Sequence, residues 1–198
     1  MKLPLQKYVA EFIGTFALAG VVTLSVIYAL PFTPLIAALT LGVGVFVLGP
    51  ICGAHFNPAI TVGFWSVGKI TTRDGIAYIV AQLLAGLVAY VCMPMLAQDV
   101  LITAAEGDWL TGLAEAVGAF FLAMGVASVV YGKVKESAGF AVGGSLLVGI
   151  FFASTLSDGI LNPAVALASG AWSLAYAAGP VLGALIGVWA YRWMAGAK

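Results

Sequence analysis

The sequence predicts an all-α integral membrane protein, in which six transmembrane helices and two short re-entrant helices form an inverted repeat. Three observations support this fold class. The composition is strongly apolar, the basic residues fall on one side of the expected membrane crossings, and a short motif occurs at corresponding places in the two halves of the chain.

The composition excludes most classes of soluble protein. Hydrophobic residues make up 63% of the 198 residues and charged residues only 8%, whereas a soluble domain carries about 25% charged residues. The formal net charge is zero, so no nucleic-acid partner is expected. The two cysteines and the single histidine form no metal-binding pattern, and the sequence predicts neither a metal site nor a cofactor.

Six apolar stretches are long enough to cross the core of a bilayer, which requires about 20 residues per helix. They fall near residues 8–30, 35–52, 75–97, 110–131, 138–156 and 173–194. Two further apolar stretches, near 57–67 and 162–171, begin at Asn-Pro and are too short to span the bilayer. We therefore expect a single domain over residues 1–198, with short connections between its helices.

All eight basic residues lie on the same side of the membrane in this arrangement. They occur near the two ends, after the first short stretch and between the fourth and fifth spans: Lys2, Lys7, Lys69, Arg73, Lys133, Lys135, Arg192 and Lys198. The opposite loops contain only acidic charges: Asp99, Glu106, Asp108 and Asp158. Because basic loops stay in the cytoplasm, both termini are predicted to be cytoplasmic, with the protein in the inner or plasma membrane.

The chain repeats itself with an offset of about 105 residues. Residues 10–16, Ala-Glu-Phe-Ile-Gly-Thr-Phe, correspond to 114–120, Ala-Glu-Ala-Val-Gly-Ala-Phe, and a second motif recurs as two boxes: Asn57-Pro58-Ala59 and Asn162-Pro163-Ala164. The halves, about 1–97 and 104–198, contain three spans each, so the second half must be inverted relative to the first. A functional site is then expected at the bilayer midplane.

The two Asn-Pro pairs predict helix starts that face each other at the midplane. Asparagine caps free backbone N–H groups, and proline at the first helical position has no N–H to satisfy. The preceding backbone is expected to be non-helical and to line a wet cavity: Gly53, Ala54, His55, Phe56, Ile160 and Leu161. Because a helix N-terminus carries about half a positive charge, the centre should repel cations and admit water and neutral solutes.

The paired Asn-Pro-Ala boxes, the segment 10–16 and the segment Gly-Ala-His-Phe-Asn-Pro-Ala-Ile-Thr at 53–61 resemble the major intrinsic proteins, the aquaporin and aquaglyceroporin family. The resemblance covers essentially the whole chain. It implies a pore in every subunit, with the two boxes at its centre, and a homotetramer in the lipid bilayer.

The resemblance also implies roles for polar residues inside the spans. Because a carboxylate in lipid is costly, Glu11 and Glu115 should face the interior of the helix bundle. Matching glutamates in the family accept hydrogen bonds from the loop backbone, and Gln82 matches a polar residue that braces them. His55 matches a family histidine beside the first box, where a bracing role is expected and a gating role is the alternative. A proton relay is the alternative role for the two glutamates.

One position departs from the family pattern. Family members usually carry arginine directly after the second box, where it forms part of a narrow outer filter; here that residue is Val165. The other filter positions correspond to Gly159 and fall near Ala37 and Ala153. The filter is therefore predicted to be apolar and wide, with a weaker barrier to cations and protons. Asp158 is expected to be a solvated acid near the mouth, or else to attract a polar solute.

The predicted function is a passive channel for water and small neutral solutes. One alternative is a facilitator of glycerol, urea or ammonia with little selectivity for water. Another is a coupled small-solute transporter, because inverted repeats also build transporters, and a third is a non-conducting structural protein. An intramembrane enzyme is not expected, because the chain has one histidine and no Gly-x-Ser-x-Gly motif.

Overall fold

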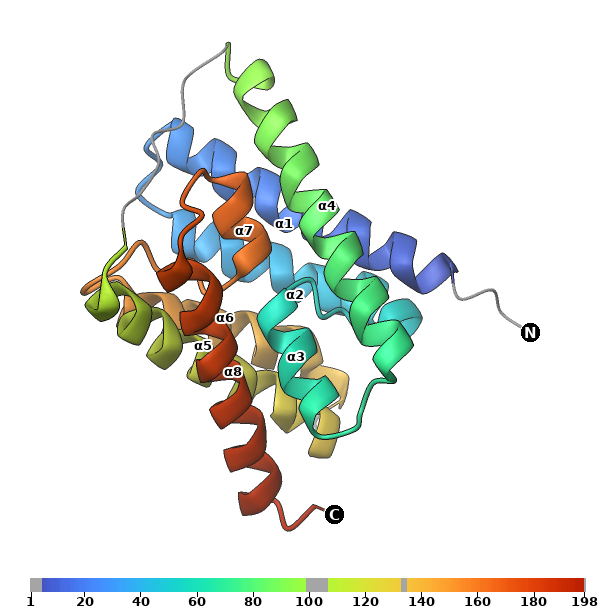
Figure 1. Ribbon diagram of the computed structural model, residues 1–198. Helices are drawn as coiled ribbons and strands as arrows, with labels where there is room; N and C mark the ends of the chain where they lie inside the picture. Colours follow the sequence, from blue (N-terminus) through green and yellow to red (C-terminus); the bar gives the residue numbers. More distant parts are fainter. Residues whose placement is uncertain (1–4, 99–106, 133–134, 198) are drawn as a thin grey trace.

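The computed structural model describes residues 5–98, 107–132 and 135–197, which form eight α-helices joined by short loops (Figure 1). The helices are α1 (Leu5–Ile27), α2 (Thr33–Cys52), α3 (Pro58–Ser66), α4 (Thr72–Leu96), α5 (Trp109–Tyr131), α6 (Ala138–Ala153), α7 (Pro163–Ala168) and α8 (Leu174–Met194), with a 3-10 turn at Lys135–Ser137 before α6. Within the described residues, six helices are long and apolar enough to cross a membrane. The fold class predicted from the sequence is confirmed.

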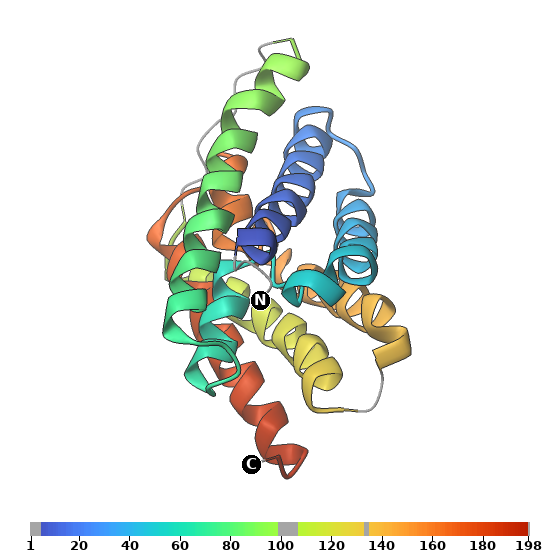
Figure 2. The same ribbon diagram turned by 90° about the vertical axis from the view of Figure 1, so that its right-hand side faces the viewer.

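The two halves pack in corresponding ways and interlock through their short helices. Helix α1 packs against α2 and α4, and α5 packs in the same way against α6 and α8. Helix α3 packs against α8, and α7 packs against α4, so each short helix lies beside a long helix of the other half. Figure 1 shows this packing between the halves: α3 lies next to α8 and α7 lies next to α4. The same arrangement is visible after a quarter turn (Figure 2).

Glycines allow the long helices to approach each other closely. A Cβ atom at Gly183 of α8 would overlap the carbonyl oxygen of Ala116 in α5, and one at Gly143 of α6 would overlap the carbonyl oxygen of Ala38 in α2. In lipid, where the hydrophobic effect between helices is absent, van der Waals packing contributes to helix association, and small residues allow the close approach that it needs. These crossings therefore set the spacing of the bundle.

The outer surface of the bundle is apolar, as a lipid-facing surface must be. Large hydrophobic side chains along all six long helices are exposed, including Phe151 at 78% and Leu182 at 56%. Exposed tryptophans lie near helix ends, where their amphipathic rings suit the membrane interface: Trp109, Trp172, Trp189 and Trp193. This distribution fits a protein that spans the bilayer.

The described basic residues gather at one end of the bundle. The Lys7 ammonium at the start of α1 lies 2.7 Å from the carboxylate of Asp74 near the start of α4. The Lys69 ammonium, just after α3, lies 4.7 Å from the ring centroid of Tyr131 at the end of α5. Arg192 lies in the last turn of α8. Lys2, Lys133 and Lys198, and the acidic Asp99 and Glu106, lie outside the described residues.

Helices α6 and α7, like α1, end a few residues earlier than the apolar pattern predicts. Helix α7 stops at Ala168 because Gly170 takes a left-handed conformation, with a φ of 75°, and the N–H of Ala171 turns back to the carbonyl of Ala166. Helix α6 stops at Ala153. The following turn is held by the backbone N–H of Ser157, which donates to the carbonyl of Ala153 at 3.0 Å. Hydropathy does not detect such local turns, because the residues that form them are themselves apolar or small.

The helix crossings lead to a prediction for Gly183. Replacing Gly183 with alanine should lower the free energy of unfolding by about 1–3 kcal/mol, because the added methyl group would force α5 and α8 apart. Gly144→Ala in α6 is the matched control, since a Cβ there meets no heavy atom within 4 Å. Thermal unfolding in detergent, followed by circular dichroism, measures both. Equal melting temperatures for the two variants would contradict the proposed packing role of Gly183.

Candidate functional site

Two asparagines form the centre of the molecule, and each contacts both halves of the chain. Asn57 caps α3 and Asn162 caps α7: the side-chain Oδ1 of each accepts a hydrogen bond from the backbone N–H two residues further on, at 2.8 and 3.0 Å. The Nδ2 of Asn57 donates to the carbonyl of Leu161 at 2.9 Å. The Nδ2 of Asn162 donates to the carbonyl of Phe56, also at 2.9 Å. The two caps therefore tie the two non-helical loops to each other.

The residue before each asparagine has a strained backbone. Phe56 has a φ of 46° and Leu161 a φ of 57°, in the left-handed region, which costs a residue with a side chain about 1–2 kcal/mol. Such strain persists only where the surroundings enforce it. Its occurrence at matching positions in both halves indicates that the two loops follow the same path.

Glycines of the repeated segment make room for these two residues. A Cβ at Gly14 of α1 would overlap the ring of Phe56, and a Cβ at Gly118 of α5 would overlap the side chain of Leu161. Gly14 and Gly118 occupy equivalent places in the repeats 10–16 and 114–120. The repeat seen in the sequence therefore has a packing role: it seats the side chain that precedes each asparagine.

Glu11 holds the first loop from inside α1. Its carboxylate is fully buried and accepts hydrogen bonds from the backbone N–H groups of His55 at 2.9 Å and Phe56 at 2.7 Å. It also accepts one from the side-chain amide of Gln82, at 2.8 Å. Gln82 in turn donates to the hydroxyl of Thr61 in α3, at 3.0 Å. The network thus connects α1, α4, α3 and the loop.

Glu115 holds the second loop in the corresponding way. Its buried carboxylate accepts hydrogen bonds from the backbone N–H groups of Ile160 at 2.9 Å and Leu161 at 2.5 Å. The third donor differs from that of the first half: it is the hydroxyl of Ser157, at 2.8 Å, which also accepts from the N–H of Gly159. A buried carboxylate is tolerated because N–H and O–H donors replace the water it has lost.

A tyrosine of the third long helix supports each loop: in the first half the hydroxyl of Tyr78 donates to the carbonyl of Cys52 at 2.7 Å, and in the second half the tyrosine is Tyr176. The hydroxyl of the buried Tyr176 in α8 accepts a hydrogen bond from the N–H of Asp158 at 3.1 Å and donates to Oδ2 of the same residue at 2.9 Å. The Asp158 side chain is exposed. Tyr176 therefore holds a charged group at the end of the bundle away from the basic residues.

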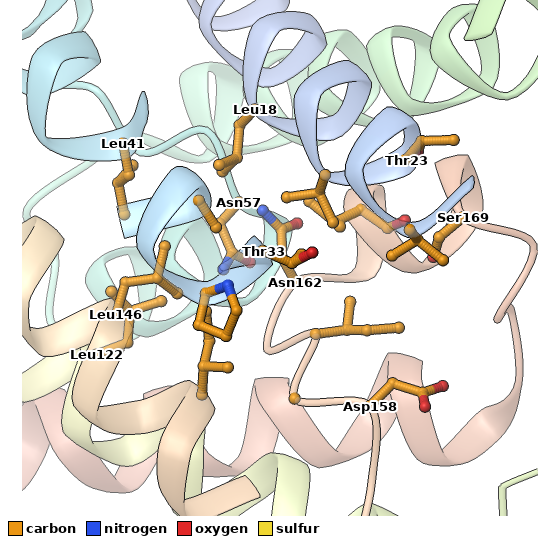
Figure 3. A pocket seen from close by; sticks show the side chains of 18 of the residues that line it. Leu18, Thr23, Thr33, Leu41, Asn57, Leu122, Leu146, Asp158, Asn162 and Ser169 are labelled. Atoms are coloured by element: carbon orange, nitrogen blue, oxygen red, sulfur yellow. The ribbon is translucent and has the colours of Figure 1, made fainter. Parts of the chain in front are cut away.

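A cavity of about 600 Å³ runs along the paired asparagines. It is lined at one end by residues of the α1–α2 and α6–α7 connections, and it reaches past the asparagines to Ala54 and His55. Its two sides differ in polarity. Figure 3 shows Leu41, Leu122 and Leu146 on one side of the asparagine pair, and Thr23, Ser169 and Asp158 on the other. A polar molecule in this cavity would therefore meet the side chains of Thr23, Ser169 and Asp158 on one side and leucine side chains on the other.

The structure brings eight of the sixteen predicted pore-centre, filter and pore-lining residues to this cavity. Its wall includes both asparagines and several loop and filter positions: Ala54, His55, Ile160, Ala37, Gly159 and Val165. Gly53, Phe56 and Leu161 are not among the described residues that line it. Gly53 ends α2 with a φ of 85°, and the carbonyls of Phe56 and Leu161 are already bonded to the asparagines.

Ala153, near which one filter position was expected, does not line the cavity. Ala153 is fully buried beside Gly118, at the contact between α5 and α6. Ile150 and Ser154 of the same region line the cavity instead. The physical reason is helix rotation: α6 is apolar on every side, so its sequence does not show which side faces the cavity.

Sequence reasoning missed two residues that support the second loop. Ser157 lies in a loop with no motif around it, and Tyr176 lies in an apolar span where an aromatic residue is unremarkable. Thr61 was visible as part of the segment 53–61, but its link to Gln82 depends on the packing of α3 against α4. Long-range hydrogen bonds of this kind leave no periodic signal in the sequence.

The sequence profile of the family described as "Major intrinsic protein" matches residues 2–191. Aquaporin NIP1-1 of Zea mays is 32% identical over 211 residues, covering 95% of this chain and 74% of that protein. Nodulin-26 of Glycine max is also 32% identical over 211 residues, covering 95% of this chain and 77% of that protein.

A solved structure shares the fold. The X-ray structure of the aquaglyceroporin from Plasmodium falciparum superposes with a TM-score of 0.71 at 18% identity, covering 98% of this chain and 96% of that one. The profile match spans nearly all of the chain, and the sequence relatives match it over almost its full length. The chain therefore belongs to the major intrinsic protein family.

Proposed function

We propose that this protein is a passive transmembrane channel for water and small neutral solutes, with an apolar outer constriction. The observation that carries the proposal is the cavity along the paired asparagines, with Val165 in its wall directly after the second box. The Nδ2 groups of Asn57 and Asn162 are held side by side by carbonyls of the opposite half. Each Nδ2 has a second N–H, which donates to the oxygen of water or of a hydroxyl group, whereas an N–H group offers no lone pair to a cation.

A passive channel fits the hydrogen bonds better than a coupled transporter does. A transporter opens alternately to the two sides by moving one half against the other. Here each asparagine bonds a carbonyl of the opposite half, and each short helix packs against a long helix of the opposite half. Rocking of the halves would break these contacts together. The same geometry supports a central role for both boxes, including Pro58, Ala59, Pro163 and Ala164.

The outer constriction is proposed to be wide because small or apolar side chains surround it. Ala37, Ile150, Gly159 and Val165 line the cavity at this level. A pore without a fixed guanidinium admits larger neutral molecules, and glycerol, urea and ammonia are therefore candidate permeants beside water. The loss of that charge also weakens one barrier to protons.

We also propose that both termini are cytoplasmic and that the protein forms a homotetramer. The clustering of Lys7, Lys69 and Arg192 at one end of the bundle supports cytoplasmic termini, by the positive-inside rule. Family membership supports a homotetramer, and the exposed apolar faces of the long helices offer surfaces that other subunits or lipid can cover.

The proposed channel activity is tested by stopped-flow light scattering on proteoliposomes, with gradients of water, glycerol and urea. We expect faster shrinkage than in empty vesicles, because a preformed pore removes the cost of dissolving water in hydrocarbon. A pH-sensitive dye inside the vesicles reports proton leakage, and external protease reports insertion and sidedness. Permeability equal to that of empty vesicles, with insertion verified, would refute the channel proposal. Solute uptake that saturates and depends on an ion gradient would favour a transporter.

The proposed constriction predicts the effect of Val165→Arg. A guanidinium group in the cavity wall should lower the permeability to glycerol and urea by about tenfold relative to water, because it narrows the passage and adds a fixed charge. Val165→Ile, which keeps the wall apolar, should preserve the order of permeabilities. The same stopped-flow measurement gives both. An unchanged order in Val165→Arg would show that the constriction lies elsewhere.

The proposed bracing role of Glu115 predicts a loss of stability in Glu115→Gln. The amide cannot accept from the N–H groups of both Ile160 and Leu161, so one buried donor loses its partner, at a cost of about 1–3 kcal/mol. Glu136→Gln, in the exposed 3-10 turn, is the control and should change stability by less than about 0.5 kcal/mol. Thermal unfolding in detergent compares them. A Glu115→Gln protein of normal stability that conducts solute but loses proton coupling would instead establish a proton relay.

A further inference from the structure

Asp158 gives the cavity an uncompensated negative charge. Among the described residues that line the cavity, Asp158 is the only one with a carboxylate, and none has an ammonium or guanidinium group. His55, the other ionisable residue in the lining, precedes Asn57 on the far side of the asparagine pair. In Figure 3, Asp158 lies apart from the two asparagines. The charge is therefore confined to one mouth of the cavity.

The carboxylate of Asp158 is positioned before any solute arrives. The hydroxyl of Tyr176, a residue only 2% exposed, donates to its Oδ2 at 2.9 Å and accepts the N–H of Asp158 at 3.1 Å. Within the described residues, Oδ1 accepts no hydrogen bond. A fixed carboxylate with a free oxygen loses little freedom when a ligand binds to it, which favours binding.

The protein places no counter-charge near this carboxylate within the described residues. Lys7, Lys69 and Arg192 lie at the opposite end of the bundle. Val165 stands where a cation is usual in the family, and Ile150 and Ile160 line the same end of the cavity. Low-dielectric walls around one sign of charge concentrate its field and raise the local concentration of counter-ions.

We propose that the mouth formed by Asp158, Ser154 and Ile160 is a binding site for small alkylammonium cations, and that an occupied site slows the passage of neutral solutes. The ammonium N–H groups donate to Oδ1 of Asp158, in a charge-assisted hydrogen bond. The alkyl group contacts the apolar wall at Ile150 and Val165. A strongly hydrated ion such as sodium has no alkyl group for that wall and serves as the reference ion.

The bound cation stops at the mouth because the next groups along the cavity are donors. Both asparagine Nδ2 atoms present N–H groups, and each asparagine caps the N-terminus of its short helix, where the helix dipole is positive. A cation that left Asp158 would find no second carboxylate in the described lining. The slowing of solute flow rests on the proposed channel function, whereas the binding itself does not.

The proposal is tested with methylammonium chloride, replacing sodium chloride at constant ionic strength, in two measurements. The first is water flux in stopped flow, expressed for each protein relative to its own flux without methylammonium. The second is saturation-transfer NMR of the methylammonium methyl protons on protein in nanodiscs, which reports binding without conduction. For the unchanged protein we expect saturable inhibition of water flux and a saturable NMR signal.

Three variants identify the group responsible. Asp158→Asn should raise two methylammonium concentrations by about tenfold or more, because the charge-assisted bond is lost. They are the concentration that halves water flux and the concentration that half-saturates the NMR signal. Tyr176→Phe, which frees the carboxylate, should raise both by about threefold, since Tyr176 only positions Asp158. Asp108→Asn is the matched control: it removes one charge from the N-cap of α5, beside a separate, smaller cavity, and asparagine still caps the helix. It should leave both concentrations unchanged.

The outcomes separate the mouth site from the channel. Equal NMR titrations for the unchanged protein and Asp158→Asn, or an equal loss in Asp108→Asn, would overturn the site. Binding that depends on Asp158 but leaves water flux undiminished would overturn the obstruction. An absence of water flux in the unchanged protein, together with Asp158-dependent binding, would refute the channel proposal and support the site.

Discussion

The structure depends on two buried carboxylates that hold non-helical backbone in the middle of the bundle. Backbone N–H groups at this depth have no water to bind, so each loop needs acceptors supplied by the protein. Glu11 and Glu115 supply them, each from the first long helix of its own half, and each is satisfied in turn by a polar side chain, Gln82 or Ser157. The left-handed conformations of Phe56 and Leu161 persist because these hydrogen bonds and the asparagine amides fix the backbone on both sides.

The two halves form one rigid body because the asparagine and the short helix of each half contact the other half. Each asparagine caps its own short helix with Oδ1 and donates from Nδ2 to a carbonyl of the other loop. The short helices α3 and α7 pack against α8 and α4 of the other half. Movement of one half would therefore disrupt caps, loops and helix contacts at once. A cavity held in this way keeps its shape without a ligand, which is the physical requirement of a passive pore and is unfavourable for a transporter that must alternate between two forms.

The two loops differ in the groups that surround them, although their paths correspond. The first loop is linked to α4 and α3 through Gln82 and Thr61, all uncharged side chains around a buried glutamate. The second is linked to α8 through Tyr176, which positions an exposed carboxylate at the mouth. Asp158 is the one carboxylate among the described residues that line the cavity, and these also include the polar Ser154 and the apolar Val165. The asymmetry lies in the groups around the second loop, whereas the bracing glutamates and the capping asparagines correspond in the two halves.

The sequence by itself determined the class, the number of spans, the two short helices and the place of the boxes, because hydropathy and Asn-Pro helix starts act locally. Most span boundaries agree with the helices to within a few residues; α1, for example, covers Leu5–Ile27 against an expected 8–30. Only the tertiary structure decided that Ile150 faces the cavity while Ala153 faces α5, that Ser157 and Tyr176 support the second loop, and that the asparagines bind across the halves. The reason is physical: a helix that meets lipid on one side and apolar neighbours on the other has no amphipathic pattern to indicate its inward face, and hydrogen bonds between distant segments exist only once the helices have packed.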